Sequence, residues 1–294
     1  ALKKTGGKNY RIFFIANPPT EYLQHINKLL RQNFPAGVKF PNADTFDKVI
    51  GSGRSTDEAA ETCLWGLDLM RGFLNLGELN NRFRISSDWN PVNLIVLGPV
   101  QALFDENDAA IGHSYFEPHY NPKVRLLRSR EHVSQLSEFY RVQYGSLRKK
   151  IRIRREIERI IVRYCRALDL PDLQYAFLKL WSVLERLTSN DSVEGIARRV
   201  AGAYGPGVRE YVRQEVRTLG HMRNVHLHVG SEMQNTENRL YALKRYVDLL
   251  LQVLLDSAFS FHILDEFGRF LELSGKENFD RTVSLMEYAK RFRN

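Results

Sequence analysis

The second half of the chain repeats its apolar residues every three or four positions, as amphipathic helices do. One such stripe begins at Leu147, and another follows Pro171-Asp172, a pair that is typical of a helix start. Further helices are expected over the long apolar segment from Asn235 to Phe267 and over Phe279–Phe292. From about residue 145 onward, the pattern therefore predicts helices throughout.

The first half has a mixed pattern. Two short apolar runs closed by prolines, Arg11–Ala16 and Asn93–Pro99, are typical of buried strands. Between them, Ser55–Glu58 indicates a helix start, because Ser followed three residues later by Glu can cap the first turn. Residues 104–125 are rich in Pro, Asn, Asp and Gly and are predicted to form an ordered surface loop. A further helix is expected to begin near Ser129.

Together these patterns predict a mainly α protein in two parts. Residues 1–145 would form a smaller mixed α/β region, which could act as a sensor or regulatory part. Residues 146–294 would form a helical bundle. At 294 residues, the chain is long enough to bury a substantial core.

Composition narrows the class of partner. The net charge of +9 favours an anionic partner such as nucleic acid. Cys63 and Cys165 lie far apart and form no CxxC pair, so a reduced, cytoplasmic protein is expected. The most apolar stretch, Tyr246–Leu264, carries Asp248 and Asp256, which are costly in lipid, so no membrane partner is expected. The chain has neither a starting Met nor a secretory signal, and we expect it to be trimmed or part of a longer protein.

The densest group of chemically active side chains is the run Arg223-Asn224-Val225-His226-Leu227-His228. Arginine offers a fixed guanidinium fork that suits a phosphate. Histidine can take or give a proton near neutral pH. These two groups are the minimum set for cleaving an RNA phosphodiester without a metal.

This run and its flanks resemble the R-x4-6-H motif of HEPN-domain ribonucleases, in particular their Apea-like branch. The helices from about 170 to 265 are similar to the HEPN domain in three motifs. These are A-F-L-K-L-W-S-V-L-E-R-L at 176–187, Met222–Gly230 and Leu243–Tyr246. More loosely, residues 57–60 and 69–75 are similar to segments upstream of the domain in the same branch.

The resemblance implies a helical bundle that cuts RNA without a metal or other cofactor, in a cleft formed by two protomers. Carried over to this chain, Arg223 would hold the scissile phosphate and His228 would be the general acid/base. Asn224 would orient one of them, and the product would end in a 2′,3′-cyclic phosphate. The implied protein is a homodimeric endoribonuclease with a role in defence or as a toxin. Gly230 stands where some HEPN toxins carry a tyrosine that a partner nucleotidyltransferase modifies, so regulation of that kind is not expected.

Helix geometry adds a reason to expect a homodimer. Residues five apart on one helix differ by about 140° in direction, so Arg223 and His228 do not share a face. Asn224 and His228 do share one, together with His221. A single protomer would therefore bring Arg223 and His228 together only if the helix were broken near Gly220.

Other interpretations of these residues remain open. Arg223 and His228 could be a surface pair at a helix end, or could belong to a HEPN bundle that binds RNA or acts as a scaffold without cutting. A metal site is the rival chemistry, and its ligands would come from His221, His226, His228, His113 and His119. No HExxH or Cys/His spacing is present, and the neighbouring arginine would repel a cation, so no metal is expected.

A dense basic run lies near the start of the helical part. Its candidate RNA-binding residues are Arg148, Lys149, Lys150, Arg152, Arg155 and Arg159. The alternative is a solvated helix face, which is the usual role of such runs. A basic surface of this kind would raise the affinity for RNA without selecting a sequence. Glu185, farther along, could orient Arg223 across the bundle or serve as a polar partner within the core.

Overall fold

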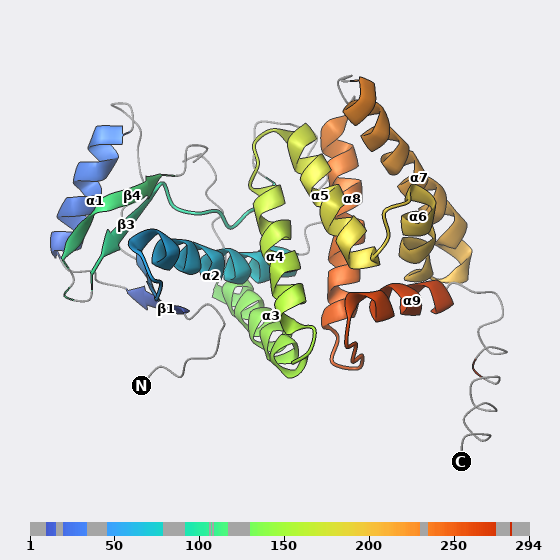
Figure 1. The fold of residues 1–294 in the computed structure, drawn as a ribbon, viewed down its shortest axis with the longest axis horizontal. Helices are drawn as coiled ribbons and strands as arrows, with labels where there is room; N and C mark the ends of the chain where they lie inside the picture. The colour runs from blue at the N-terminus through green and yellow to red at the C-terminus, as the bar shows by residue number, and fades with distance from the viewer. Residues whose placement is uncertain are drawn as a thin grey trace, which may run out of the picture.

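The computed structural model describes residues 10–15, 20–33, 46–78, 92–105, 107, 109–116, 130–229, 235–274 and 283. Helices dominate this part of the chain, and its strands form two small antiparallel pairs, so the prediction of a mainly α fold is confirmed. The helices are α1 (Thr20–Asn33), α2 (Thr56–Gly77), α3 (Arg130–Lys149), α4 (Arg154–Leu168), α5 (Leu173–Thr188), α6 (Val193–Gly202), α7 (Pro206–Val229), α8 (Thr236–Leu255) and α9 (Leu264–Ser274). The strands are β1 (Tyr10–Ile15), β2 (Phe46–Gly51), β3 (Val100–Phe104) and β4 (Ala110–Phe116). Figure 1 shows α1 and the strands at one end of the molecule, α5 to α9 at the other, and α2, α3 and α4 between them.

The strands confirm one sequence expectation and correct another. β1 lies where the first apolar run predicted a strand, and it pairs with β2 in a register that runs from Tyr10↔Gly51 to Ile15↔Phe46. The strand predicted over 93–99 is wrong, because this segment is fixed by side-chain contacts. Both Leu94 and Ile95 donate their backbone N–H to Asn75 Oδ1 of α2 at 2.9 Å. Strand pairing in this part of the chain begins only at β3.

The surface loop predicted over 104–125 is also wrong in part. β4 occupies Ala110–Phe116 and pairs with β3 from Val100↔Phe116 to Phe104↔Ala110. The turn between them is short because Asp105 Oδ1 accepts the backbone N–H of Asn107 and of Ala109, at 2.8 and 2.9 Å. Residues 117–125 lie outside the described part of the chain.

The long helix predicted over 235–267 is divided in two. α8 ends at Leu255, and a turn leads to α9 at Leu264. The carbonyls that a continuing helix would use are bound by α3 and the residue after it. Ser146 Oγ donates to Leu255 O at 2.5 Å, and Lys150 Nζ donates to Asp256 O at 2.8 Å. The helix predicted over 279–292 lies outside the described residues, apart from position 283.

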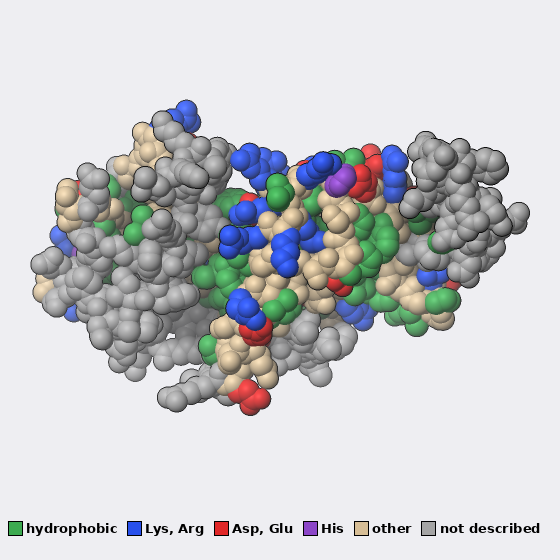
Figure 2. All heavy atoms as spheres, turned by 90° about the horizontal axis from the view of Figure 1, so that it is seen from below, with side chains coloured by type: hydrophobic (Ala, Val, Ile, Leu, Met, Phe, Trp, Pro, Cys, Tyr) green, Lys and Arg blue, Asp and Glu red, His purple; other side chains and the backbone are tan. Residues whose placement is uncertain are grey.

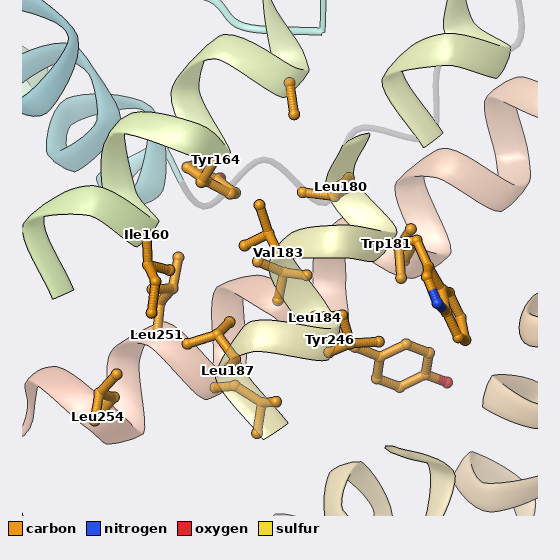
Figure 3. Packing of buried hydrophobic residues seen from close by; sticks show 14 of the residues in the cluster. Ile160, Tyr164, Leu180, Trp181, Val183, Leu184, Leu187, Tyr246, Leu251 and Leu254 are labelled. Atoms are coloured by element: carbon orange, nitrogen blue, oxygen red, sulfur yellow. The ribbon is translucent and has the colours of Figure 1, made fainter. Parts of the chain in front are cut away.

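Among the described residues, one hydrophobic cluster runs from α2 through α4 and α5 to α8 and α9. α5 is central to it, and Figure 3 shows its side chains with Ile160 of α4 and Leu251 of α8 on one side and Tyr246 of α8 on the other. Fully burying one such side chain contributes roughly 1.5–3 kcal/mol. Phe73 of α2 belongs to the same core, and the boundary predicted between residues 145 and 146 lies inside α3. The division into two parts stays a prediction.

Candidate functional site

Helix α7 carries the candidate catalytic residues, packs closely against α6 and reaches side chains of α5. Gly220 marks this close approach, because a Cβ built there would lie 2.6 Å from Val193 Cγ1 and 2.8 Å from Trp181 Cη2. Neither contact is tolerated without displacement of the neighbours. α7 nevertheless continues as a helix through this position to Val229. Gly220 therefore serves helix packing and does not break the helix.

Arg223 lies about one turn after Gly220, where α7 faces Glu185 of α5. Its Nη2 donates to Glu185 Oε1 at 3.3 Å, and its Nη1 donates to Asn224 Oδ1 at 2.9 Å. The same Glu185 oxygen accepts a hydrogen bond from Trp181 Nε1 at 2.9 Å. The side chains of Arg223 and Glu185 are 30% and 25% exposed. The guanidinium is therefore anchored on α5 and still reaches solvent.

Arg223 and Asn224 are brought together, whereas the helix positions 223 and 228 point in different directions. Position 228 lies on α7, about 140° around the helix from position 223, and α7 has no break that would bring the two onto one face. The side chain of His228 lies outside the described residues. His221 is exposed and His226 is partly buried.

The candidate RNA-binding residues lie where α3 is followed by α4, in a segment that we call the basic corner (residues 148–155). Arg148, Lys149, Arg152 and Arg155 are exposed there, and Arg159 is exposed farther along α4. Figure 2 shows Lys and Arg side chains gathered in the middle of this face. Five of the six candidate residues therefore share an exposed region.

Lys150 is the exception. Its side chain is buried, and its Nζ donates to Asp256 O at 2.8 Å and to Phe259 O at 2.6 Å. Burial also lowers the pKa of Lys150. In this structure Lys150 holds the turn between α8 and α9 and does not belong to the exposed basic surface.

The basic corner and the α7 motif lie at different edges of the bundle. In Figure 1 the turn from α3 to α4 is at the lower edge of the molecule, whereas the carboxy-terminal end of α7 is at the upper edge. The structure therefore does not bring the two sets of candidate residues into one site within a protomer.

Among the described residues, one group of potential metal ligands is present, between α2 and α4. Asp68, Cys165 and Asp169 offer ligand atoms that all lie within 4.8 Å of one another. Arg71 already pairs with both carboxylates, with Nη2 2.5 Å from Asp68 Oδ1 and 2.8 Å from Asp169 Oδ2. Burial raises the pKa of the Cys165 thiol well above its usual range, which keeps it protonated and a poor ligand. We therefore interpret this group as an ionic tie between two helices.

Sequence reasoning missed this tie and left the role of Glu185 open. The available signal for the tie was Arg71 on a helix whose neighbouring positions, Leu69 and Phe73, belong to the core. A charged residue so placed must find a buried partner, because an unpaired buried charge is very costly. One of its two partners is the residue that follows α4, 98 residues later in the chain, and the sequence pattern contains no information about that distance.

No helix in the described ranges has the length and apolar character needed to cross a membrane. Comparison of the chain with protein-family models, with curated protein sequences and with solved structures found no match. The HEPN resemblance therefore rests on sequence motifs alone, those of α5, α7 and α8 and, more loosely, two segments of α2.

Proposed function

We propose that this protein is a metal-independent endoribonuclease of the HEPN type, acting as a homodimer. The observation that carries the proposal is the placement of Arg223. Of the five N–H donors of its guanidinium, one is used by Glu185 and one by Asn224 among the described residues. Three donors remain for a phosphate, and the anchored side chain loses little rotamer freedom when a phosphate binds.

The chemistry follows from the two residue types. His228 of one protomer would remove the proton of a ribose 2′-hydroxyl, and the 2′-oxygen would attack the adjacent phosphorus. The bond from phosphorus to the 5′-oxygen would then break, that oxygen would take a proton from water, and the His228 imidazolium would release its own proton to solvent. Arg223 would stabilise the charge that develops on the phosphoryl oxygens. The products are a 2′,3′-cyclic phosphate and a free 5′-hydroxyl.

A homodimer is part of this proposal, because α7 does not place positions 223 and 228 on one face. Two copies that pack along α7 would let Arg223 of one chain meet His228 of the other. A role in defence or as a toxin, and a cytoplasmic location, are carried from the family resemblance and from the cysteine content.

The first test is cleavage of single-stranded RNA by the purified full chain in EDTA. We expect cleavage in EDTA that is lost in His228→Ala and retained in His25→Ala, a matched histidine change on α1, at the opposite end of the molecule from α7 (Figure 1). Cleavage that EDTA abolishes would instead indicate a histidine-bound metal. No cleavage under any condition would contradict the enzymatic proposal.

A mixing experiment tests the composite site. Arg223→Ala and His228→Ala chains are each expected to be inactive. In a mixed dimer, however, one site would combine the intact Arg223 of one chain with the intact His228 of the other. Refolding the two variants together should therefore restore a fraction of the wild-type rate. A mixture that dimerises and stays inactive would contradict a site shared between protomers.

The alternative is a HEPN bundle that binds RNA or acts as a scaffold without cutting. The ion pair between Arg223 and Glu185 favours it, because part of the arginine charge is already compensated within one chain. Salt-sensitive RNA binding that survives both Arg223→Ala and His228→Ala, with no product formed, would support this alternative.

A further inference from the structure

Helix α4 presents a row of arginines along one exposed face. Arg155, Arg159 and Arg163 follow one another at intervals of four residues, and all three are exposed. Four residues correspond to about 400° of rotation, so successive members turn by only about 40° and the three span about 80°. The row begins at the basic corner, where Arg148, Lys149 and Arg152 are also exposed.

The acidic residues of α4 do not neutralise Arg159 and Arg163. Glu158 is buried and pairs with Arg154 at 2.7 Å. Glu156 pairs with Arg186 of α5. Arg159 and Arg163 have no ion-pair partner in the part of the chain that the structure describes.

Arg166, one turn farther along α4, shows the contrast. Its Nε lies 2.6 Å from Asp68 Oδ2, so α2 supplies a counter-charge at the end of the row. Neighbouring like charges at intervals of four residues repel one another and destabilise a helix. The fold therefore gains nothing from leaving Arg159 and Arg163 unpaired, and an external anion is the simplest compensation.

We propose that this row and the basic corner form a track for the backbone of single-stranded RNA. The row consists of Arg155, Arg159 and Arg163, and its identification as an RNA surface rests on the proposed function. One step of four residues advances about 6 Å along the helix. This is nearly twice the roughly 3.4 Å per nucleotide of a stacked strand. The spacing therefore favours an extended strand with unstacked bases, whose consecutive phosphates lie farther apart.

The side chains of the track also indicate how the strand is recognised. The exposed residue within the basic corner that is not charged is Ile151, which is 83% exposed. No aromatic side chain of the described residues between 148 and 155 is available to stack on a base. Binding should therefore depend on phosphates, ignore sequence and weaken steeply with salt.

The track lies apart from the α7 motif, so each can be removed without the other. We would measure binding of the full chain to a fluorescent oligouridylate between 50 and 200 mM salt. Arg159→Gln combined with Arg163→Gln removes two positive charges from the track. The matched control is Arg54→Gln combined with Arg269→Gln. These changes remove one exposed arginine just before α2 and one exposed arginine on α9.

Each phosphate contact on a single strand contributes about 0.7 to the slope of log affinity against log salt. The track variant should therefore lower the slope by about 1.4, so that between 50 and 200 mM salt it loses about sevenfold less affinity than wild type. The control variant should lower the slope by less than half as much as the track variant does. Thermal unfolding should show that both variants are folded. This readout needs no cleavage, so an inactive wild-type protein would contradict the proposed enzyme and leave the track measurable.

Two results would overturn the track. In the first, the slope for RNA is unchanged in the track variant, or falls equally in the control because only net charge matters. In the second, the track variant keeps its affinity for RNA and loses binding to vesicles that contain phosphatidylserine. That result would assign the row to an anionic lipid surface.

Discussion

Substituting Gly220 with alanine tests the packing that places Arg223 opposite Glu185. The new Cβ would lie 2.6 Å from Val193 Cγ1 and 2.8 Å from Trp181 Cη2. Trp181 has little room to move, because it is 1% exposed and its Nε1 is bonded to Glu185. The helix must therefore shift away from α5, or the Trp181 ring must move together with its hydrogen-bond partner.

The expected change in the free energy of unfolding combines two opposing effects. Alanine is a better helix former than glycine by about 1 kcal/mol. Overpacking a well-filled contact costs about 1–3 kcal/mol. Gly207 lies in the first turn of the same helix, and a Cβ there meets no atom within 4 Å. Gly207→Ala should therefore stabilise the protein by up to about 1 kcal/mol, whereas Gly220→Ala should be neutral or destabilising. The difference between the two variants measures the overpacking cost.

Urea unfolding followed by circular dichroism would measure both variants, with equal slopes as the check that the unfolded states are comparable. Val193→Ala should relieve part of the clash when it is combined with Gly220→Ala, so the two changes should be less than additive. If Gly220→Ala stabilises the protein as much as Gly207→Ala does, α7 does not approach Trp181 closely. The contact between Arg223 and Glu185 would then lose its structural basis.

Two further stability predictions concern other helix contacts. Arg71→Ala should lower the free energy of unfolding by about 3–5 kcal/mol, because it leaves Asp68 buried without its main counter-charge. Arg166→Gln, which removes a half-exposed partner of the same carboxylate, should cost less than about 1 kcal/mol, and equal losses in urea unfolding would contradict a buried tie. Hydrogen bonds from Arg217 and Arg213 of α7 lower the pKa of Glu194 to about 2. The contribution of this ion pair to stability is therefore present above about pH 4.3 and is lost as the pH falls toward 2. Because this side chain is 49% exposed, wild type and Glu194→Gln should differ by less than about 1 kcal/mol at pH 6 and converge near pH 2, and a difference independent of pH would contradict the ion pair.

The α7 motif separates what the sequence could indicate from what it could not. Arginine, asparagine and histidine within six residues indicate a phosphate site from their chemistry alone. The direction of each side chain around the helix follows from 3.6 residues per turn, which is why a site shared between two protomers was expected. The role of Glu185 could not be decided, because it depends on how closely α5 and α7 approach, and that distance is set by Gly220, Val193 and Trp181 together.

The sequence by itself determined the elements whose causes are local. Apolar residues at helical spacing placed α4, α5, α7 and α8, because burying one face of a helix requires that spacing and little else. Only the tertiary structure decided where a helix such as α8 ends, and which polar side chains are buried against partners that are distant in the sequence. Lys150 looked like one more cation of a basic run, yet it is buried on the carbonyls of Asp256 and Phe259, more than 100 residues later. The physical reason is the same in each case, because a buried polar group must be paired, and the fold alone decides which partner is within reach.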